Sequence, residues 1–215
     1  MDLSLYLVTD ARQASERGRD VVETVVEAVA GGVSAVQVRE KDAAARHVLH
    51  LVVALAERLP SRVALFVNDR TDVFLAARSL GAAVAGVQVG QDDLPVADVR
   101  RLVGPEARIG LSVATRAQLS AAASSPARVD YVGIGTVRPT RSKPDAPPAL
   151  GVEGVVRLAA SSALPAVAIG GVTADDLPQL RVGGLAGAAV ASSVCAAPDP
   201  RAAARALRGV WDEVA

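Results

Sequence analysis

The sequence predicts an α/β fold of the (β/α)8 TIM-barrel type, formed as one domain by residues 1–215, and three observations favour it. The length is within the usual range for a single barrel and leaves no room for a second large domain. Short apolar runs alternate with longer segments of helical period, which indicates repeated strand–helix units. Polar residues and glycines follow nearly every apolar run, as at the mouth of a barrel.

Eight apolar runs are interpreted as strands, and that number favours a closed barrel. The predicted strands cover residues 5–9, 35–39, 64–68, 86–89, 108–112, 130–134, 166–169 and 187–190. The predicted helices include residues 21–30, 43–58, 73–80, 96–103, 118–123, 152–160 and 202–214. An open doubly wound sheet would show the same alternation, but its functional residues would gather at one switch point. Here they are spread over seven strand ends, which favours the barrel.

Composition and charge narrow the classes of partner. Lys plus Arg and Asp plus Glu both number 23, so we expect no overall field that attracts nucleic acid or an anionic membrane. The N-terminus has no signal-peptide pattern and the apolar stretch 183–197 is too short to span a bilayer, so we expect a cytoplasmic protein. Aromatic residues make up only 2%, so the core is expected to consist of Ala, Val and Leu. A homo-oligomer stays open, because outer helices could bury Ala and Val against a partner.

The single cysteine and the two histidines are given no catalytic role. Cys195 has no second cysteine for a disulfide and no metal-ligand spacing, so it is interpreted as a small buried residue rather than a catalytic thiol. His47 and His50 lie three residues apart on a predicted helix and are expected on its exposed face.

Fixed charges gather where the second predicted strand ends, in the run Gln37-Val38-Arg39-Glu40-Lys41. Two cations and an amide at the end of a buried strand are costly to assemble unless they meet an anion. Phosphate is the usual anion at the mouth of a barrel. The run therefore predicts a phosphate-binding site.

Two carboxylates follow the third and fourth predicted strands. Asp69 or Thr71 could instead cap the next helix, and Asp93 could cap the helix that carries Pro95 in its first turn. Neighbouring strands would, however, bring Asp69 and Asp93 together. Two carboxylates with phosphate oxygens and waters suit Mg²⁺, whereas zinc is disfavoured because no His or Cys is near.

Glycine-rich or small-residue turns follow the last two predicted strands. Gly170-Gly171 and Ala191-Ser192 occupy the places where barrels often bind phosphate through backbone N–H groups. Each turn taken alone could be an ordinary tight turn that uses small residues. The pair after consecutive strands predicts a second phosphate seat.

The segment 137–148 contains four prolines and alternating charges, which exclude a helix. Its length after the sixth predicted strand favours a functional loop over the mouth, although a solvated surface loop is the alternative. Thr140, Ser142 and Lys143 would contribute two hydroxyls and one ammonium group there.

The chain resembles the thiamine-phosphate synthase family over nearly its whole length. The resemblance rests on seven motifs that stand in order at successive strand ends. They are QVREK at 37–41, ND at 68–69, GQDD at 90–93, LS at 111–112, PTRSK at 139–143, IGG at 169–171 and AS at 191–192. The family joins hydroxymethylpyrimidine diphosphate to thiazole phosphate and releases pyrophosphate.

The resemblance implies a role for each matching residue. The pyrimidine diphosphate would be held by Gln37, Val38, Arg39, Glu40, Lys41, Asn68, Ser112 and Lys143. The thiazole phosphate would be held by Thr140, Arg141, Ser142, Gly171, Ala191 and Ser192. Asp69 and Asp93 would be the Mg²⁺ ligands, and Arg39, Lys41 and Lys143 would act in catalysis by stabilising the leaving diphosphate.

The sequence departs from the family pattern at four positions. The family often has His at Gln88, a second Lys at Pro144, Thr at Ser142, and Ile or Val at Ala191. Ser142 keeps the hydroxyl and Ala191 keeps its N–H, so these two changes preserve the implied roles. Loss of the second Lys leaves the charge contribution of the loop open.

Two other functions remain as alternatives. A thiazole tautomerase shares the fold but uses a His after the fifth strand, where this chain reads Ser112-Val113-Ala114-Thr115. A catalytically silent phosphate-binding barrel would be expected to lose Asp69, Asp93 or Lys143, all of which are present. Both observations favour the synthase.

Overall fold

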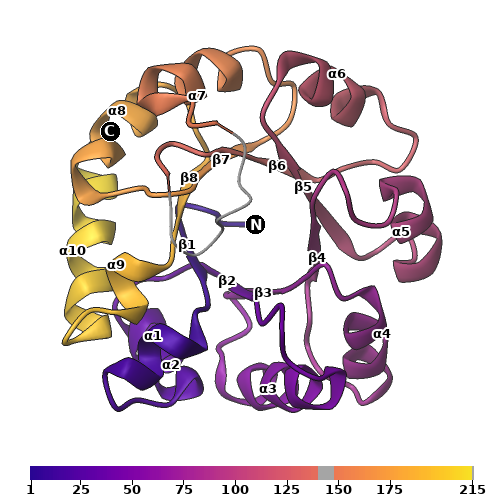
Figure 1. The fold of residues 1–215 in the computed structure, drawn as a ribbon, viewed down its shortest axis with the longest axis vertical. Helices are drawn as coiled ribbons and strands as arrows, with labels where there is room; N and C mark the ends of the chain where they lie inside the picture. Colours follow the sequence, from indigo (N-terminus) through magenta and orange to yellow (C-terminus); the bar gives the residue numbers. More distant parts are fainter. Residues whose placement is uncertain (140–147, 215) are drawn as a thin grey trace.

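The computed structural model describes residues 1–139 and 148–214 and forms a closed, all-parallel barrel. Figure 1 shows the strands in the centre and the helices around them. Each strand pairs with its neighbours in chain order, and β1 closes the ring on β8. The strands are β1 (Leu5–Val8), β2 (Ala35–Val38), β3 (Ala64–Asn68), β4 (Gly86–Val89), β5 (Arg108–Val113), β6 (Tyr131–Gly135), β7 (Ala166–Ile169) and β8 (Gly187–Val190). The predicted (β/α)8 barrel is confirmed.

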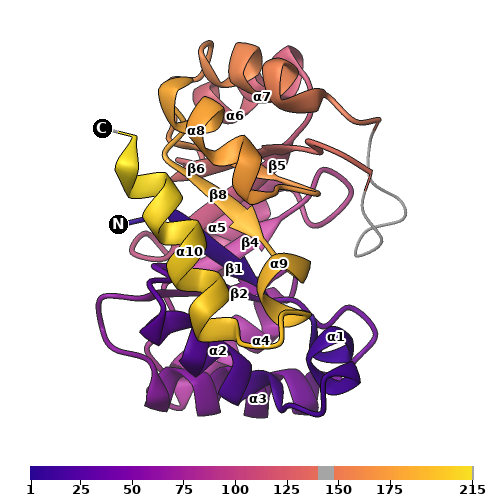
Figure 2. The same ribbon diagram turned by 90° about the vertical axis from the view of Figure 1, so that its left-hand side faces the viewer.

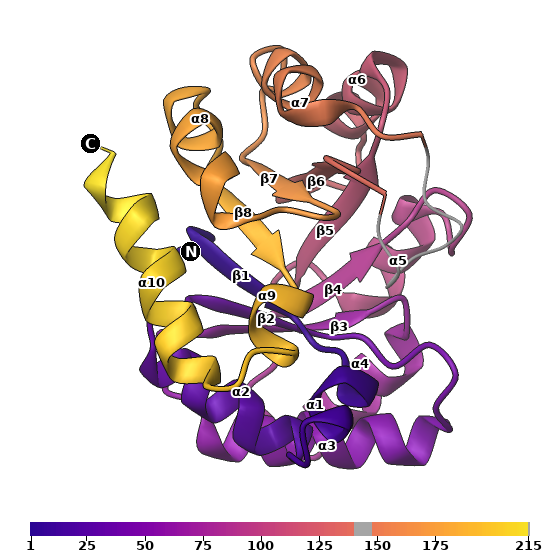
Figure 3. The same ribbon diagram turned by 60° about the vertical axis from the view of Figure 1, so that its left-hand side comes forward.

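The helices form the outer layer. They are α1 (Ala11–Glu16), α2 (Val21–Ala30), α3 (Ala45–Arg58), α4 (Thr71–Ser79), α5 (Val96–Val103), α6 (Arg116–Ser124), α7 (Gly151–Ala159), α8 (Leu177–Val182), α9 (Ser192–Cys195) and α10 (Pro200–Glu213), with a 3-10 turn at Ala174–Asp176. Figure 2 shows both termini at one end of the barrel, with β8 running toward α9 at the other end. α10 packs on α2, where a Cβ at Gly31 would come within 2.3 Å of the Arg201 carbonyl oxygen (Figure 3). No helix in the described residues is long and apolar enough to cross a membrane.

The structure contains three short helices beyond the predicted ones, α1, α8 and α9. They have only four to six residues, so they offer too few turns for a periodic pattern in the sequence. Predicted strand ends are also off by one residue in places: β6 begins at Tyr131 instead of Asp130. The Asp130 carboxylate instead accepts the Ile109 N–H at 2.8 Å and pairs with Arg100 and Arg108.

The core has two layers of different composition. Between strands and helices, the buried side chains are mainly Val, Leu, Ile and Ala, as predicted. Inside the barrel, Tyr6, Phe66 and Tyr131 pack with ring centroids 5.4 to 6.1 Å apart. Three of the five aromatic residues of the chain therefore fill the barrel interior. They provide a rigid floor beneath the mouth.

Candidate active site

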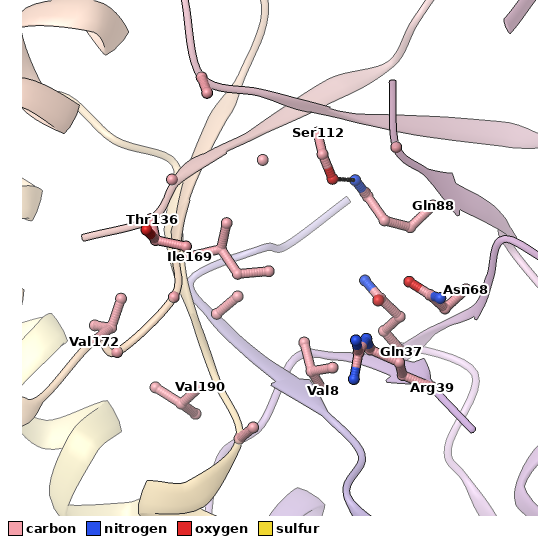
Figure 4. A pocket seen from close by; sticks show the side chains of 18 of the residues that line it. Val8, Gln37, Arg39, Asn68, Gln88, Ser112, Thr136, Ile169, Val172 and Val190 are labelled. Atoms are coloured by element: carbon pink, nitrogen blue, oxygen red, sulfur yellow. Dashed lines mark hydrogen bonds between the residues drawn. The ribbon is translucent and has the colours of Figure 1, made fainter. Parts of the chain in front are cut away.

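A cavity of about 360 Å³ opens at the carboxyl ends of the strands. Figure 4 shows that its two sides differ: most of the labelled polar side chains gather on one side, and Ile169, Val172 and Val190 lie on the other with Thr136. Among the residues implicated from the sequence, those that line the cavity include Gln37, Arg39, Asn68, Ser112, Gly170, Gly171, Ala191 and Ser192. The structure therefore brings residues from β2, β3, β5, β7 and β8 to one opening.

The period of two along β2 separates the members of the charged run. Gln37 and Arg39 line the cavity, whereas the side chain of Val38 is buried among the residues between sheet and helices. The structure therefore does not bring the Val38 side chain to the mouth. Lys41 follows at an exposed position of the loop.

Glu40 and Thr9 fix the backbone at the end of β2. The Thr9 Oγ1 accepts the Arg39 N–H at 2.9 Å and donates to the Glu40 carboxylate at 3.2 Å. Burial raises the pKa of Glu40 above its ordinary value, against the opposing effect of the Thr9 hydrogen bond. The Glu40 side chain thus helps to fix the loop through Thr9, and the neighbouring Arg39 lines the cavity.

Asp69 and Asp93 meet at the rim, as the adjacency of β3 and β4 predicts. Burial, followed by a hydrogen bond and charge repulsion from Asp93, raises the pKa of Asp69 to about 6. Asn68 donates to the Asp69 carboxylate at 2.6 Å, and the positive charge of Lys41 partly offsets the rise. The backbone of Asp69 is left-handed, with φ of 57°, and its N–H donates to the Gln88 carbonyl at 2.8 Å.

The alternative that these carboxylates cap helices finds no support in the geometry. Arg70 is the N-cap of α4 and Pro95 is the N-cap of α5, and neither cap has a side-chain hydrogen bond. Asp93 instead accepts the N–H of Gly90 at 2.7 Å within its own loop. Both carboxylates are therefore held outside the helices.

The donor set suits a hard divalent cation. Two carboxylates in contact repel each other, and a cation between them would relieve that repulsion. No group of three or more His, Cys, Asp or Glu suited to a metal occurs in residues 1–139 and 148–214. A cation here would therefore take its remaining ligands from substrate oxygens and water, as Mg²⁺ commonly does.

Gln88 is a residue of the cavity to which the sequence analysis assigned no role. It is 4% exposed, and its Nε2 donates to the Ser112 Oγ at 3.1 Å (Figure 4). Gln91 also contacts Ser112, since its Nε2 donates to the Ser112 carbonyl at 2.7 Å. The signal in the sequence was the alternation of Gln88 with apolar residues along β4, which places it inside the barrel.

The glycine side of the mouth is formed by backbone. Gly170 and Gly171 have φ of 88° and 69°, and a Cβ on Gly171 would lie 2.9 Å from the Arg138 Cβ. Ala191 is the N-cap of α9, and Ser192 begins its first turn, where backbone N–H groups have no partner within the helix. These features fit an anion held by backbone N–H groups.

Arg138 is a second residue that sequence reasoning missed. It forms a two-pronged ion pair with the buried Asp176 and donates to the Gly171 carbonyl at 3.3 Å. Burial acts to raise the pKa of Asp176, but hydrogen bonds from Arg138 and Thr173 leave it below its ordinary value. Arg138 thus links the chain after β6 to the glycine turn after β7. Its partners lie 38 residues apart, so no local pattern could reveal it.

The structure tests the sequence-based predictions for the cysteine and the histidines, but not those for the loop at residues 140–144. Cys195 is fully buried, and burial raises its pKa to about 12, which fits a packing residue rather than a nucleophile. His47 and His50 are exposed on α3, as expected. Thr140, Arg141, Ser142, Lys143 and Pro144 lie outside the described residues, and their roles stay predictions.

Comparisons with known proteins agree with this geometry. The family model described as thiamine monophosphate synthase matches residues 5–194. The chain is 48% identical over 210 residues to a thiamine-phosphate synthase of Azorhizobium caulinodans, which covers 97% of this chain and 95% of the relative. It is 45% identical over 206 residues to one of Corynebacterium efficiens, covering 96% and 94%.

Solved structures give the same result. A thiamine phosphate pyrophosphorylase from Pyrococcus furiosus superposes with a TM-score of 0.85 at 34% identity and covers 99% of this chain and 96% of its own. A 3-hexulose-6-phosphate synthase superposes with a TM-score of 0.71 at 15% identity, over 97% of this chain and 99% of its own, and shares the fold alone. On the extent of the family match and the identity to its members, the chain belongs to the thiamine monophosphate synthase family.

Proposed function

We propose that this chain joins hydroxymethylpyrimidine diphosphate to thiazole phosphate in a Mg²⁺-dependent reaction that forms thiamine phosphate and releases pyrophosphate. The observation that supports this most is the meeting of Asp69 and Asp93 at the rim of a cavity lined by Gln37, Arg39 and Ser112. A metal-bound diphosphate needs carboxylates that bind the metal and, beside them, side chains that bind the anion.

The polar side of the mouth would hold the pyrimidine diphosphate. Arg39 lines the cavity, and Lys41 is close enough to the carboxylate pair to lower the pKa of Asp69. Mg²⁺ bound by Asp69 and Asp93 would neutralise charge on the diphosphate. Lys143 is proposed as a further cation over the same group, on the basis of the family motif.

The glycine side would hold the thiazole phosphate. Gly171, Ala191 and Ser192 line the cavity after β7 and β8, so backbone N–H groups there would bind the phosphate. Ile169 and Val190 give an apolar wall, against which a heterocycle would pack. Thr140, Arg141 and Ser142 are proposed to join this phosphate site from the loop.

The chemistry is a substitution at the methylene carbon of the pyrimidine. The bond from that carbon to the diphosphate oxygen breaks, and its electron pair leaves with pyrophosphate. The electron-rich aminopyrimidine ring carries the resulting positive charge. The thiazole nitrogen then donates its lone pair to form the new C–N bond. The protein stabilises the leaving group and aligns the two rings, and no protein nucleophile is required.

Product analysis tests the proposal. Both phosphorylated substrates are mixed with the protein and Mg²⁺, and thiamine phosphate is measured by mass spectrometry. We expect product with Mg²⁺, none after chelation with EDTA, and recovery when Mg²⁺ is added back. Turnover that is unaffected by chelation would refute the metal dependence. Binding of thiazole phosphate alone, with no affinity for the pyrimidine diphosphate, would favour a tautomerase or a silent barrel.

We also place the reaction in the cytoplasm, as the sequence leads us to expect, because both substrates carry phosphate groups that a bilayer excludes. Fractionation of cells that produce the protein tests this location. The proposed site uses residues of one chain only. Sedimentation equilibrium tests whether the protein forms a homo-oligomer.

A further inference from the structure

Glu40 is an acidic residue between two cations, Arg39 and Lys41, at a mouth that is proposed to bind a diphosphate. A carboxylate that faced the cavity would repel the diphosphate and offset the positive charge beside it. The structure places the Glu40 side chain elsewhere: it is half-buried and is not among the described residues that line the cavity, whereas Arg39 is (Figure 4). Some contact must therefore hold this carboxylate away from the anion site.

Two donors from the connection between β1 and α1 hold the Glu40 carboxylate. The Thr9 Oγ1 donates to Glu40 Oε1 at 3.2 Å, and the Ala11 N–H also forms a hydrogen bond with the carboxylate. Thr9 is 2% exposed, and its own N–H donates to the Gln37 carbonyl at 2.9 Å, so its backbone is held in place. The carboxylate is thus tied to the connection after β1.

The groups around the Thr9 hydroxyl fix the direction of its hydrogen bonds. The Arg39 N–H can only donate, so the Thr9 Oγ1 accepts from it at 2.9 Å. The single hydroxyl proton of Thr9 is then directed to Glu40, which as a carboxylate can only accept. One hydroxyl therefore binds both the backbone of the cation that lines the cavity and the side chain of the anion that does not.

The charges around the carboxylate agree with this placement. Burial raises the pKa of Glu40, the charge of Asp10 raises it further, and the charge of His47 lowers it. The positive charge of Lys41 acts instead on Asp69, in the carboxylate pair at the rim. Among the described residues, no ion pair joins Glu40 to a cation.

We propose that Thr9 is a positioning residue that keeps the negative charge of Glu40 away from the diphosphate site, so that the run Arg39-Glu40-Lys41 acts on an anion as two cations. The inference rests on the proposed function and deepens it. Without the Thr9 hydroxyl, the carboxylate loses a donor in the connection after β1, and rotation of its side chain would bring it toward the cations and the diphosphate. The resulting loss of binding comes from the charge of Glu40, so removal of that charge should relieve it.

The test is a double-mutant cycle, measured by calorimetric titration of inorganic pyrophosphate in the presence of Mg²⁺. Thr9→Val removes the hydroxyl and keeps the branched shape, and we expect it to weaken pyrophosphate binding about tenfold, because a negative charge then lies near the anion. Adding Glu40→Gln to Thr9→Val should strengthen binding again, by about threefold to fivefold. In the wild-type background Glu40→Gln should give no gain, because the carboxylate is already held away.

Glu40→Asp covers the case in which Thr9→Val does not fold. It keeps the charge but shortens the side chain by one methylene group, which moves the carboxylate away from the Thr9 hydroxyl. We expect Glu40→Asp to bind pyrophosphate about threefold more weakly than Glu40→Gln does, because only the aspartate variant leaves a charge untied. Equal or tighter binding by Glu40→Asp would overturn the role of the charge.

Thr24→Val is the matched control, because Thr24 is also a buried threonine whose hydroxyl donates one hydrogen bond. It lies on α2, and its Oγ1 donates to the Asp20 carbonyl at 2.9 Å. This variant should leave pyrophosphate binding unchanged. Thiazole phosphate, titrated into the same set of variants, should keep its affinity within about twofold, since its proposed seat lies after β7 and β8.

The outcomes separate this inference from the proposed function. Unchanged pyrophosphate affinity in Thr9→Val, or a loss that Glu40→Gln does not relieve, would overturn the inference and leave the proposed function intact. Equal weakening of pyrophosphate and thiazole phosphate would also overturn it, since it would indicate a general disturbance of the barrel. Failure of the wild-type protein to bind pyrophosphate with Mg²⁺ would overturn the proposed diphosphate site and this inference together.

Discussion

The two sides of the barrel mouth are made of different parts of the chain. On the side of β2 to β5, side chains project into the cavity: Gln37, Arg39, Asn68 and Ser112. On the side of β7 and β8, the cavity is lined by the glycine turn after β7, by the start of α9 and by apolar side chains. One side should therefore be sensitive to truncation of side chains, and the other to addition of a Cβ or a change of backbone conformation.

The largest expected effect is on the polar side. Asp93→Ala removes one carboxylate of the Asp69–Asp93 pair, and Lys143→Ala removes the cation proposed over the diphosphate. Each should lower kcat by about 100-fold or more, the usual effect of losing an electrostatic contact to the transition state. Both variants should stay folded, as judged by circular dichroism. Asp72→Ala, an exposed acidic residue paired with Arg70 on the same loop and helix, is the control and should keep wild-type turnover. Near wild-type coupling by Asp93→Ala or Lys143→Ala would show that the role assigned to that residue is wrong.

The glycine side should respond to an added methyl group. Gly171→Ala forces a left-handed backbone on alanine and places its Cβ 2.9 Å from the Arg138 Cβ. We expect KM for thiazole phosphate to rise by about tenfold or more, because a displaced backbone misplaces the N–H groups by enough to weaken hydrogen bonds. Binding of the pyrimidine diphosphate should be unaffected.

Gly184→Ala separates strain from position. Gly184 also has a left-handed φ, of 80°, but nothing lies within 4 Å of the added Cβ. It should lower the free energy of unfolding by about 1 kcal/mol and leave both KM values unchanged. If the two variants gave the same kinetic constants, the backbone phosphate seat at Gly171 would be refuted.

The same substitution on the two sides gives the sharpest contrast. Ser112→Ala removes a hydroxyl that accepts from Gln88 inside the cavity, and we expect KM for the pyrimidine substrate to rise about tenfold. Ser192→Ala keeps the backbone N–H of the α9 start, so the KM for thiazole phosphate should change less than about threefold. Comparable losses in both variants would mean that the glycine side also depends on side chains.

The smallest expected effect is on the free energy of unfolding and involves the Arg138–Asp176 ion pair next to the glycine turn. Arg138→Met removes the partner of Asp176, and because half of the Arg138 side chain is exposed we expect only a small loss in the free energy of unfolding at pH 7. The pKa of Asp176 is lowered in the folded protein, so its contribution is present above the unfolded pKa of 3.8 and is lost as the pH falls through the folded value. The difference between variant and wild type in urea unfolding should therefore shrink below about pH 4. A difference that stays constant down to pH 2 would contradict the ion pair.

Much of this arrangement could be predicted from sequence because it depends on short-range patterns. The alternation along β2 sends Gln37 and Arg39 inward and Val38 outward, and strand adjacency brings Asp69 to Asp93. The period of an element and its order in the chain were sufficient for these inferences.

The features that could not be predicted depend on contacts across the barrel. Tyr6 and Tyr131 stand on strands that are not neighbours, and their pairing follows from side-chain length inside a closed ring. The Arg138–Asp176 pair likewise joins two loops through tertiary packing. The short helices α1 and α9 escape prediction because four to six residues carry no readable period.

The most direct test of the account is calorimetric titration of pyrimidine diphosphate into the wild-type protein and into Asp93→Ala, each with Mg²⁺ and with EDTA. The account predicts that Mg²⁺ strengthens binding to the wild-type protein by at least about tenfold and has little effect on the variant, because the ion links the diphosphate to the carboxylate pair. Equal affinity with and without Mg²⁺ in the wild-type protein, or a Mg²⁺ effect that survives in Asp93→Ala, would contradict it.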